Sequence, residues 1–163
     1  MFFIPLFLSN LKTKKIARKI EYIRTTHSTN KTIYEMLQNN EIHSGDVLIA
    51  EEQTNGKGRR GNIWQSSSGK SLTFSLILDY DDSLMNKISL ISGVAIIEGI
   101  KKITKLDCQL KWPNDIMYKT KKLGGILIEK KGQYLIIGIG INVNDSDFEE
   151  SIQNKACSIY SIT

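Results

Sequence analysis

The sequence contains few of the residues that build metal sites and disulfide frameworks. Its 163 residues include two cysteines and two histidines. Cys108 and Cys157 form no C-x-x-C pair, and neither His27 nor His43 has a partner at the spacing of metal ligands. These absences argue against a zinc site and a disulfide framework, so no metal site is expected. The cysteine usage is typical of a reducing cytosol.

Long apolar runs are also absent. The N-terminal stretch MFFIPLFLSN is interrupted by Pro5, is too short to span a membrane, and precedes its cations, which is the wrong order for a secretory signal. The segment from Lys12 to Arg24 is basic except for Glu21, so an organelle transit peptide is one interpretation. The interpretation that we follow is an N-terminal extension at residues 1–18 of a cytoplasmic protein without membrane contact.

Positive charge is in modest excess. The 22 lysines and arginines outnumber the 17 aspartates and glutamates, which gives a net charge of +5. Such a balance suits nucleic-acid contact, a pocket for a phosphorylated ligand, or simply a well-solvated surface. The cations gather with glycines in one loop and no series of stacking aromatics accompanies them, so a nucleic-acid partner is not expected.

Hydrophobic periodicity predicts one α+β domain over residues 19–163. Helices are expected at residues 28–37, capped by Ser28 or Thr29, and at residues 88–103, where apolar positions form a broad stripe. Strands are expected at residues 19–24, 46–51, 72–78, 106–112, 116–120, 123–130 and 134–143. Short turns between the last four runs favour a mainly antiparallel mixed sheet with helices packed on one face.

The stretch QTNGKGRRG, at residues 53–61, is the densest cluster of glycine and cations. Its glycines fit G-x-G-x-x-G, but no helix is predicted after them, which argues against a Rossmann phosphate loop. Gly69-Lys70-Ser71 resembles the end of a P-loop, but Trp64 stands where that motif requires its first glycine. A flexible loop that binds phosphate or carboxylate through Lys57, Arg59 and Arg60 remains, beside the alternative of a solvated surface loop.

Three later segments place polar residues beside bare backbone. KWPND puts Lys111 and Asp115 at one end of the sheet, or simply forms a β-turn. KLGGILIE and GIGINVN carry glycine pairs, which indicate either a ligand lying on the backbone or a bulge. No Ser-His-Asp set or Cys-His pair occurs, so the sequence offers no protein nucleophile for covalent catalysis.

Five motifs in fixed order between Ser28 and Asn142 closely resemble those of the biotin–protein ligases. They are STN, Q-x-x-G-K-G-R-R-G-x-x-W, KWPND, K-L-x-G-I-L-x-E and G-x-G-I-N. The resemblance implies a class II synthetase-like fold and an enzyme that activates biotin with MgATP to biotinyl-5′-AMP. It also implies transfer of biotin to a lysine of a biotin carboxyl carrier protein. Such chemistry depends on positioning and charge neutralisation.

The resemblance also implies roles for individual residues. The ring system of biotin would be bound by Ser28, Thr29, Asn30 and Gln53. The loop with Gly56, Lys57, Gly58 and Arg59 would close over biotin and the phosphates, and Arg59 would neutralise charge. Catalysis would depend on Arg59, on Lys122, which would bridge the biotin carboxylate and the α-phosphate, and on Asp115, which would orient or deprotonate the acceptor lysine. The remaining binding positions would be Trp64 near adenine, Asn142 at the nucleotide, Lys111 with Asn114 beside Asp115, and the bare backbone of Gly125 and Gly140.

The chain departs from the family pattern in three respects. Lys57 stands where arginine is frequent, which keeps the charge but loses the bidentate grip. No helix-turn-helix segment precedes the domain, so no DNA-binding domain is expected. The chain ends at Thr163, whereas family members continue, so we expect a catalytic domain shortened at its C-terminus. The alternatives are a truncated, non-catalytic biotin-binding fragment and a lipoate-type ligase, whose usual glycine-rich segment with histidine is missing. The oligomeric state stays open, a homodimer included.

Overall fold

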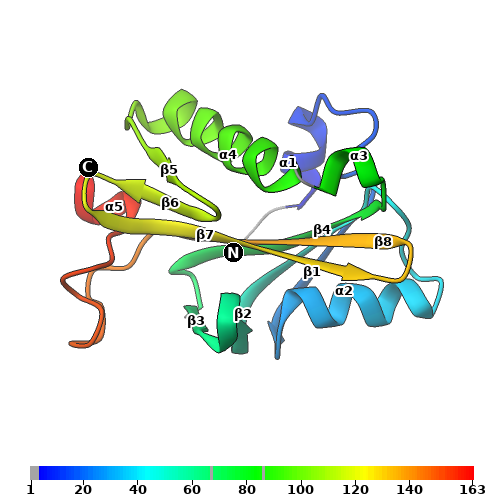
Figure 1. The fold of residues 1–163 in the computed structure, drawn as a ribbon, viewed down its shortest axis with the longest axis horizontal. Helices are drawn as coiled ribbons and strands as arrows, with labels where there is room; N and C mark the ends of the chain where they lie inside the picture. Colours follow the sequence, from blue (N-terminus) through cyan, green and yellow to red (C-terminus); the bar gives the residue numbers. More distant parts are fainter. Residues whose placement is uncertain (1–3, 67, 86) are drawn as a thin grey trace.

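A single twisted sheet forms the centre of the protein (Figure 1). The computed structural model describes residues 4–66, 68–85 and 87–163. Its strands are β1 (Ile20–Thr26), β2 (Val47–Lys57), β3 (Ile63–Ser66), β4 (Ser71–Asp79), β5 (Gln109–Lys111), β6 (Asp115–Tyr118), β7 (Lys121–Lys131) and β8 (Tyr134–Asn142). Its helices are α1 (Ile4–Asn10), α2 (Thr29–Gln38), α3 (Asp82–Met85), α4 (Ile88–Thr104) and α5 (Ile159–Ile162), with a 3₁₀ turn at Arg59–Gly61. None of the described helices is long and apolar enough to cross a membrane.

The sheet is mainly antiparallel, as the sequence predicts. The strand order is β1-β2-β4-β8-β7-β6-β5, and β3 pairs with β2 to the side of this path. The pairing of β1 with β2 is parallel, because α2 and the loop after it carry the chain across between the two strands. The other six pairings are antiparallel. The turn at Gly132 and Gln133, predicted between residues 130 and 133, joins β7 to β8.

Helices cover both faces of the sheet, so the expectation that they pack on one face is wrong. In Figure 1, α2 lies below the sheet, whereas α4 lies above it together with α1 and α3. Alternation along β8 explains the division, because successive side chains point to opposite faces. Ile136 packs against Ile33 of α2, whereas Leu135 and Ile137 belong to the cluster that α4 covers. Strands with large aliphatic residues on both faces require a cover on each.

Several parts of the fold were not predicted, among them β3 and the short helices α1, α3 and α5. β2 runs on to Lys57, so the first half of the glycine-rich stretch is strand, and its partner β3 lies in a segment without clear periodicity. The N-terminal extension contains α1, followed by Leu11, which packs on the cluster around Ile20. The predicted helix at residues 88–103 is confirmed as α4, and the helix predicted at residues 28–37 as α2.

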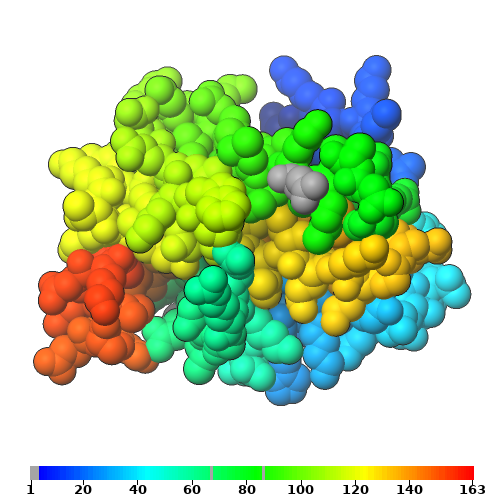
Figure 2. Space-filling view, viewed as in Figure 1, coloured from blue at the N-terminus to red at the C-terminus, as the bar shows by residue number. Residues whose placement is uncertain are grey.

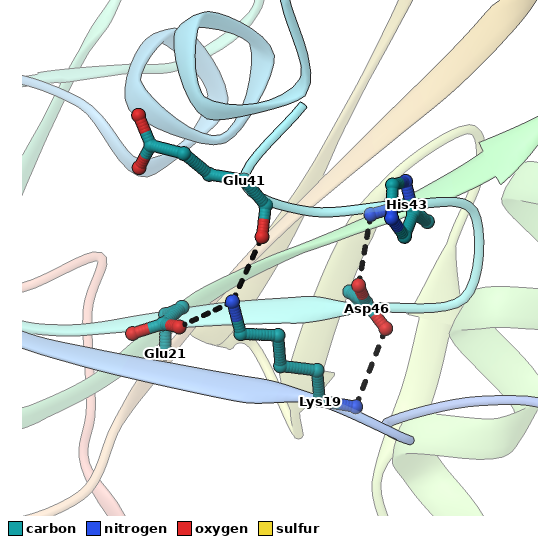
Figure 3. Close-up of polar contacts among 5 residues, drawn as sticks. All are labelled: Lys19, Glu21, Glu41, His43 and Asp46. Carbon is teal, nitrogen blue, oxygen red and sulfur yellow. Dashed lines mark hydrogen bonds and ion pairs between the residues drawn. The ribbon is translucent and has the colours of Figure 1, made fainter. Parts of the chain in front are cut away.

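A buried carboxylate fixes the start of β1 beside the loop that follows α2 (Figure 3). Asp46, which is 4% exposed, accepts hydrogen bonds from the backbone N–H of Lys19 at 3.3 Å and of His43 at 2.8 Å. The Lys19 ammonium donates to the Glu41 carbonyl at 2.8 Å and pairs with Glu21 at 2.9 Å. The hydrogen bond with Glu21 is the main cause that raises the pKa of Lys19.

Removing this buried acceptor is expected to destabilise the protein far more than removing the neighbouring surface charge. Asp46→Ala leaves two backbone N–H groups without their acceptor, which costs about 1–3 kcal/mol in the free energy of unfolding. Glu21→Ala removes only an exposed ion pair and serves as the matched control. Urea unfolding at pH 7 measures both. Equal losses in the two variants would contradict the role given to Asp46.

Candidate active site

Four segments that are distant in the sequence enclose a cavity of about 410 Å³ at the N-terminal end of α2. They are the start of α2, the loop between β2 and β3, the turn between β5 and β6, and the middle of β7 and β8. Figure 2 shows the teal segment near residue 60 standing out from the molecule next to the yellow-green segment near residue 115. A hydrogen bond joins these two segments, because Nη1 of Arg59 donates to Oδ1 of Asn114 at 3.0 Å.

The polar end of the cavity lies at the first turn of α2. Ser28 occupies the N-cap position, but its side chain makes no capping hydrogen bond, contrary to the expected role of Ser28 or Thr29 as the cap. Oε1 of Gln53, from β2, instead accepts from the backbone N–H of Thr29 at 2.7 Å and from its hydroxyl at 3.1 Å. The amide of Asn30 donates to Glu129 at 2.7 Å. Ser28, Thr29, Asn30 and Gln53 thus come together at one end of the cavity, as the sequence predicts.

The charged end of the cavity contains an ion pair between Lys122 and Asp115. Nζ of Lys122 lies 2.6 Å from Oδ1 of Asp115, and the side chains are 39% and 28% exposed. The neighbouring Asn114 is fixed to β7, since its carbonyl accepts from the Ile126 N–H at 2.9 Å and its amide donates to the Ile126 carbonyl at 3.2 Å. A ligand carboxylate or phosphate could take over the Lys122 ammonium from Asp115, which would leave Asp115 free to accept a proton.

Bare backbone on β7 and β8 makes room for three side chains of the site. A Cβ on Gly138 would overlap the amide group of Asn30, and one on Gly140 would overlap the indole ring of Trp64. A Cβ on Gly125 would lie 3.4 Å from the ammonium nitrogen of Lys122. The glycines therefore leave the expected stretch of bare backbone, but the protein's own side chains lie on it.

Trp64 lines the first cavity and also a second one of about 620 Å³. The indole ring lines both cavities, as do Gln53 and Lys122, and its buried Nε1 has no hydrogen-bond partner among the described residues. The second cavity adds two further predicted positions, Gly56 and Asn142, to these three. Asn142 is buried, and its amide donates to the Cys157 carbonyl at 3.0 Å.

The second cavity also contains an acidic segment that sequence reasoning missed, with Asp145, Asp147 and Glu149. Burial raises the pKa of Asp145 from its ordinary value, and the nearby Lys70 opposes that shift. The described residues include no group of three or more His, Cys, Asp or Glu that could hold a metal ion. Lys111 is not among the described residues that line either cavity, although it stands opposite Asp115 in the strand pairing of β5 with β6.

Two further polar residues support the site without lining the cavities. Ser75 on β4 contacts the side chains of Thr29 and Asn30, and Glu129 on β7 accepts from Asn30. Glu129 is the last letter of K-L-x-G-I-L-x-E, which was the available signal for it. Ser75 gave none, because it stands in an ordinary alternating strand.

Comparisons with known proteins show which family the chain resembles. The sequence profile described as "Biotin/lipoate A/B protein ligase family" matches residues 22–143. The "Bifunctional ligase/repressor BirA" of Bacillus subtilis is 37% identical over 158 residues, which cover 91% of this chain and 48% of that protein. The "Biotin--[acetyl-CoA-carboxylase] ligase" of Mycobacterium tuberculosis is 30% identical over 138 residues, covering 81% of this chain and 52% of that protein. The chain thus spans about half the length of these relatives.

Solved structures show the same fold. A biotin protein ligase from Aquifex aeolicus, in complex with biotin and ATP, superposes with a TM-score of 0.81 at 34% identity, covering 90% of this chain and 61% of that one. A biotin protein ligase from Leishmania major, in complex with biotinyl-5-AMP, superposes with a TM-score of 0.78 at 29% identity, covering 89% and 64%. The expected α+β, class II synthetase-like fold of the biotin and lipoate ligases is therefore confirmed.

A methyl group on Gly140 is expected to displace Trp64 from the floor of the site. In a Trp112→Phe background, Trp64 is the single tryptophan, so its fluorescence reports its surroundings alone. Gly140→Ala should shift this emission to the red, because the Cβ would occupy the space of the indole ring. Gly99→Ala, on α4 with open space around its Cβ, is the control and should leave the spectrum unchanged. An unchanged spectrum for Gly140→Ala would contradict the packing described.

Proposed function

The chain belongs to the biotin/lipoate A/B protein ligase family, and we propose that it activates biotin with ATP and transfers the biotinyl group to a protein lysine. The first product is biotinyl-5′-AMP, and the acceptor is a biotin carboxyl carrier protein or domain. The observation that carries this proposal is the position of Lys122, which lines both cavities and pairs with a carboxylate. The names and bound ligands of the related ligases support the choice of biotin and ATP.

In the first step, a carboxylate oxygen of biotin attacks the α-phosphorus of ATP, a P–O bond forms, and pyrophosphate leaves. Biotin occupies the first cavity, with its ring system at Ser28 and its carboxylate at Lys122, and the nucleotide extends past Trp64 into the second. The Lys122 ammonium holds the carboxylate and the α-phosphate together and offsets their mutual repulsion. Arg59 adds a second positive charge from the loop between β2 and β3. No protein nucleophile is required.

Mg²⁺ is proposed to enter with ATP. Mg²⁺ retains several waters and is usually held by one or two carboxylates together with substrate phosphates, where it screens phosphate charge. Asp145 and Asp147 supply carboxylates in the second cavity, so these two residues would hold the ion.

In the second step, the amine of the acceptor lysine attacks the acyl carbon, an amide bond forms, and AMP leaves. The amine loses a proton, which Asp115 accepts. This role needs the carboxylate of Asp115 to be released from Lys122, which follows when Lys122 turns to the acyl phosphate. We place the reaction in the cytoplasm, in keeping with two buried, free cysteines.

Replacing Lys122 is expected to abolish adenylation without unfolding the protein. Lys122→Ala should reduce biotin-dependent ATP–pyrophosphate exchange about 100-fold or more, because the charge at the junction of carboxylate and phosphate is lost. Lys101→Ala is the matched control. Lys101, in the last turn of α4, also pairs with an aspartate at 3.0 Å, but this pair with Asp107 lies on the surface. Full exchange by Lys122→Ala would contradict the mechanism. A folded wild-type chain that binds biotin without any exchange would indicate a non-catalytic biotin-binding protein.

Replacing Asp115 is expected to separate the two steps. Asp115→Asn should leave exchange within a few-fold of the wild type and slow transfer to a carrier protein about 100-fold or more, as for loss of a general base. Pre-formed biotinyl-5′-AMP and a carrier domain provide the assay for transfer alone. Equal losses in exchange and in transfer would show that Asp115 serves Lys122 rather than the incoming amine.

A further inference from the structure

A chain of buried hydrogen bonds runs from Glu129 to Gln53 behind the polar end of the first cavity. Asn30, which is 4% exposed, donates from Nδ2 to Oε2 of Glu129 at 2.7 Å and more weakly to the Leu127 carbonyl at 3.4 Å. Oγ of Ser75 lies 2.6 Å from Oδ1 of Asn30 and 2.7 Å from Oγ1 of Thr29. The backbone N–H of Thr29 donates to Oε1 of Gln53.

The direction of this chain is determined by Glu129. A carboxylate only accepts hydrogen bonds, so the NH₂ group of Asn30 must face Glu129 and its carbonyl oxygen must face Ser75. That oxygen also only accepts, so the hydroxyl proton of Ser75 is directed toward Asn30 and toward Oγ1 of Thr29 beside it. Thr29 donates its own hydroxyl proton to Oε1 of Gln53. The acceptor on Glu129 therefore orders Asn30 and Ser75, and the acceptor on Gln53 orders Thr29.

The same chain determines which groups remain for a ligand. Both ends of the Asn30 amide are engaged inside the protein, and so is Oε1 of Gln53. Within the described part of the chain, neither the Ser28 hydroxyl nor Nε2 of Gln53 takes part in a hydrogen bond. The ring system of biotin carries a urea group with one acceptor oxygen and two N–H donors. Nε2 of Gln53 can donate to that oxygen, and the Ser28 hydroxyl can accept from an N–H.

We propose that Asn30 and Thr29 form a frame rather than the ligand contact, and that Glu129 and Ser75 are positioning residues that set this frame. Ser28 and Gln53 contact the urea group. This inference rests on the proposed function, since it concerns how biotin is bound. It also changes the role of Asn30, which the sequence assigned to direct contact with biotin.

An exchange of amide and carboxylate between Asn30 and Glu129 tests the proposal. Asn30→Asp places two carboxylates in contact and is expected to weaken biotin binding about 100-fold or more, because like charges at hydrogen-bond distance repel. Glu129→Gln keeps an acceptor oxygen and should stay within about threefold of the wild type. The double variant restores one donor facing one acceptor, so its affinity should return to within about tenfold of the wild type. Titration calorimetry of the full chain with biotin measures all four proteins.

One further variant separates positioning from folding, and two outcomes of the titrations would overturn the inference. Glu129→Leu removes the acceptor without adding charge and is expected to weaken biotin binding about tenfold. The KM for ATP in pyrophosphate exchange should stay unchanged in Glu129→Leu, whereas a general loss of structure would raise both constants. A double variant that binds biotin as weakly as Asn30→Asp alone would overturn the inference, because Asn30 would then contact the ligand directly. A wild-type chain that does not bind biotin at all would overturn the proposed function together with the inference.

Discussion

The candidate site depends on the lack of side chains along one face of β8. On that face Ile136 packs against α2, and the next two positions that point the same way are Gly138 and Gly140. Their bare backbone lets the amide of Asn30 and the indole of Trp64 lie against the sheet, where any Cβ would collide with them. The other face of the same strand remains apolar and packs under α4. One strand thus completes the core on one side and makes room for the site on the other.

Charge gives the site its chemical character. Lys122 and Asp115 neutralise each other at the junction of two cavities, and Arg59 reaches across to Asn114. These contacts join the loop after β2 to the turn before β6. Under the proposed function, an anionic substrate competes for the same two cations, so its binding exchanges partners instead of creating an unpaired charge. Under the proposed function, the free Asp115 carboxylate that results serves the second step.

Sequence reasoning recovered the elements whose pattern is local. The alternation in β4 and the apolar stripe of α4 follow from period alone, and the motifs bring Ser28, Gln53, Asp115 and Lys122 to one cavity as expected. The continuation of β2 through polar residues was missed, because its stability comes from pairing with β3. The two covered faces were also missed, since a period does not say which face of the sheet a helix meets.

The network behind the cavity could not be predicted for a related reason. Ser75 and Glu129 meet Asn30 across 45 and 99 residues of sequence. Ser75 stands in an ordinary alternating strand, and the motif that ends at Glu129 does not say what Glu129 contacts. Buried polar contacts of this kind depend on the assembled sheet. They also decide which atoms of Asn30 and Gln53 remain for a ligand, which no motif indicates.

Under the proposed function, this chain itself forms biotinyl-5′-AMP between the two cavities. The most direct measurement is mass spectrometry of the products after the purified wild-type chain has been incubated with biotin and MgATP. We predict biotinyl-5′-AMP together with pyrophosphate, both dependent on biotin and ATP. Unchanged biotin and ATP, in a sample shown to be folded and to bind both ligands, would contradict the claim.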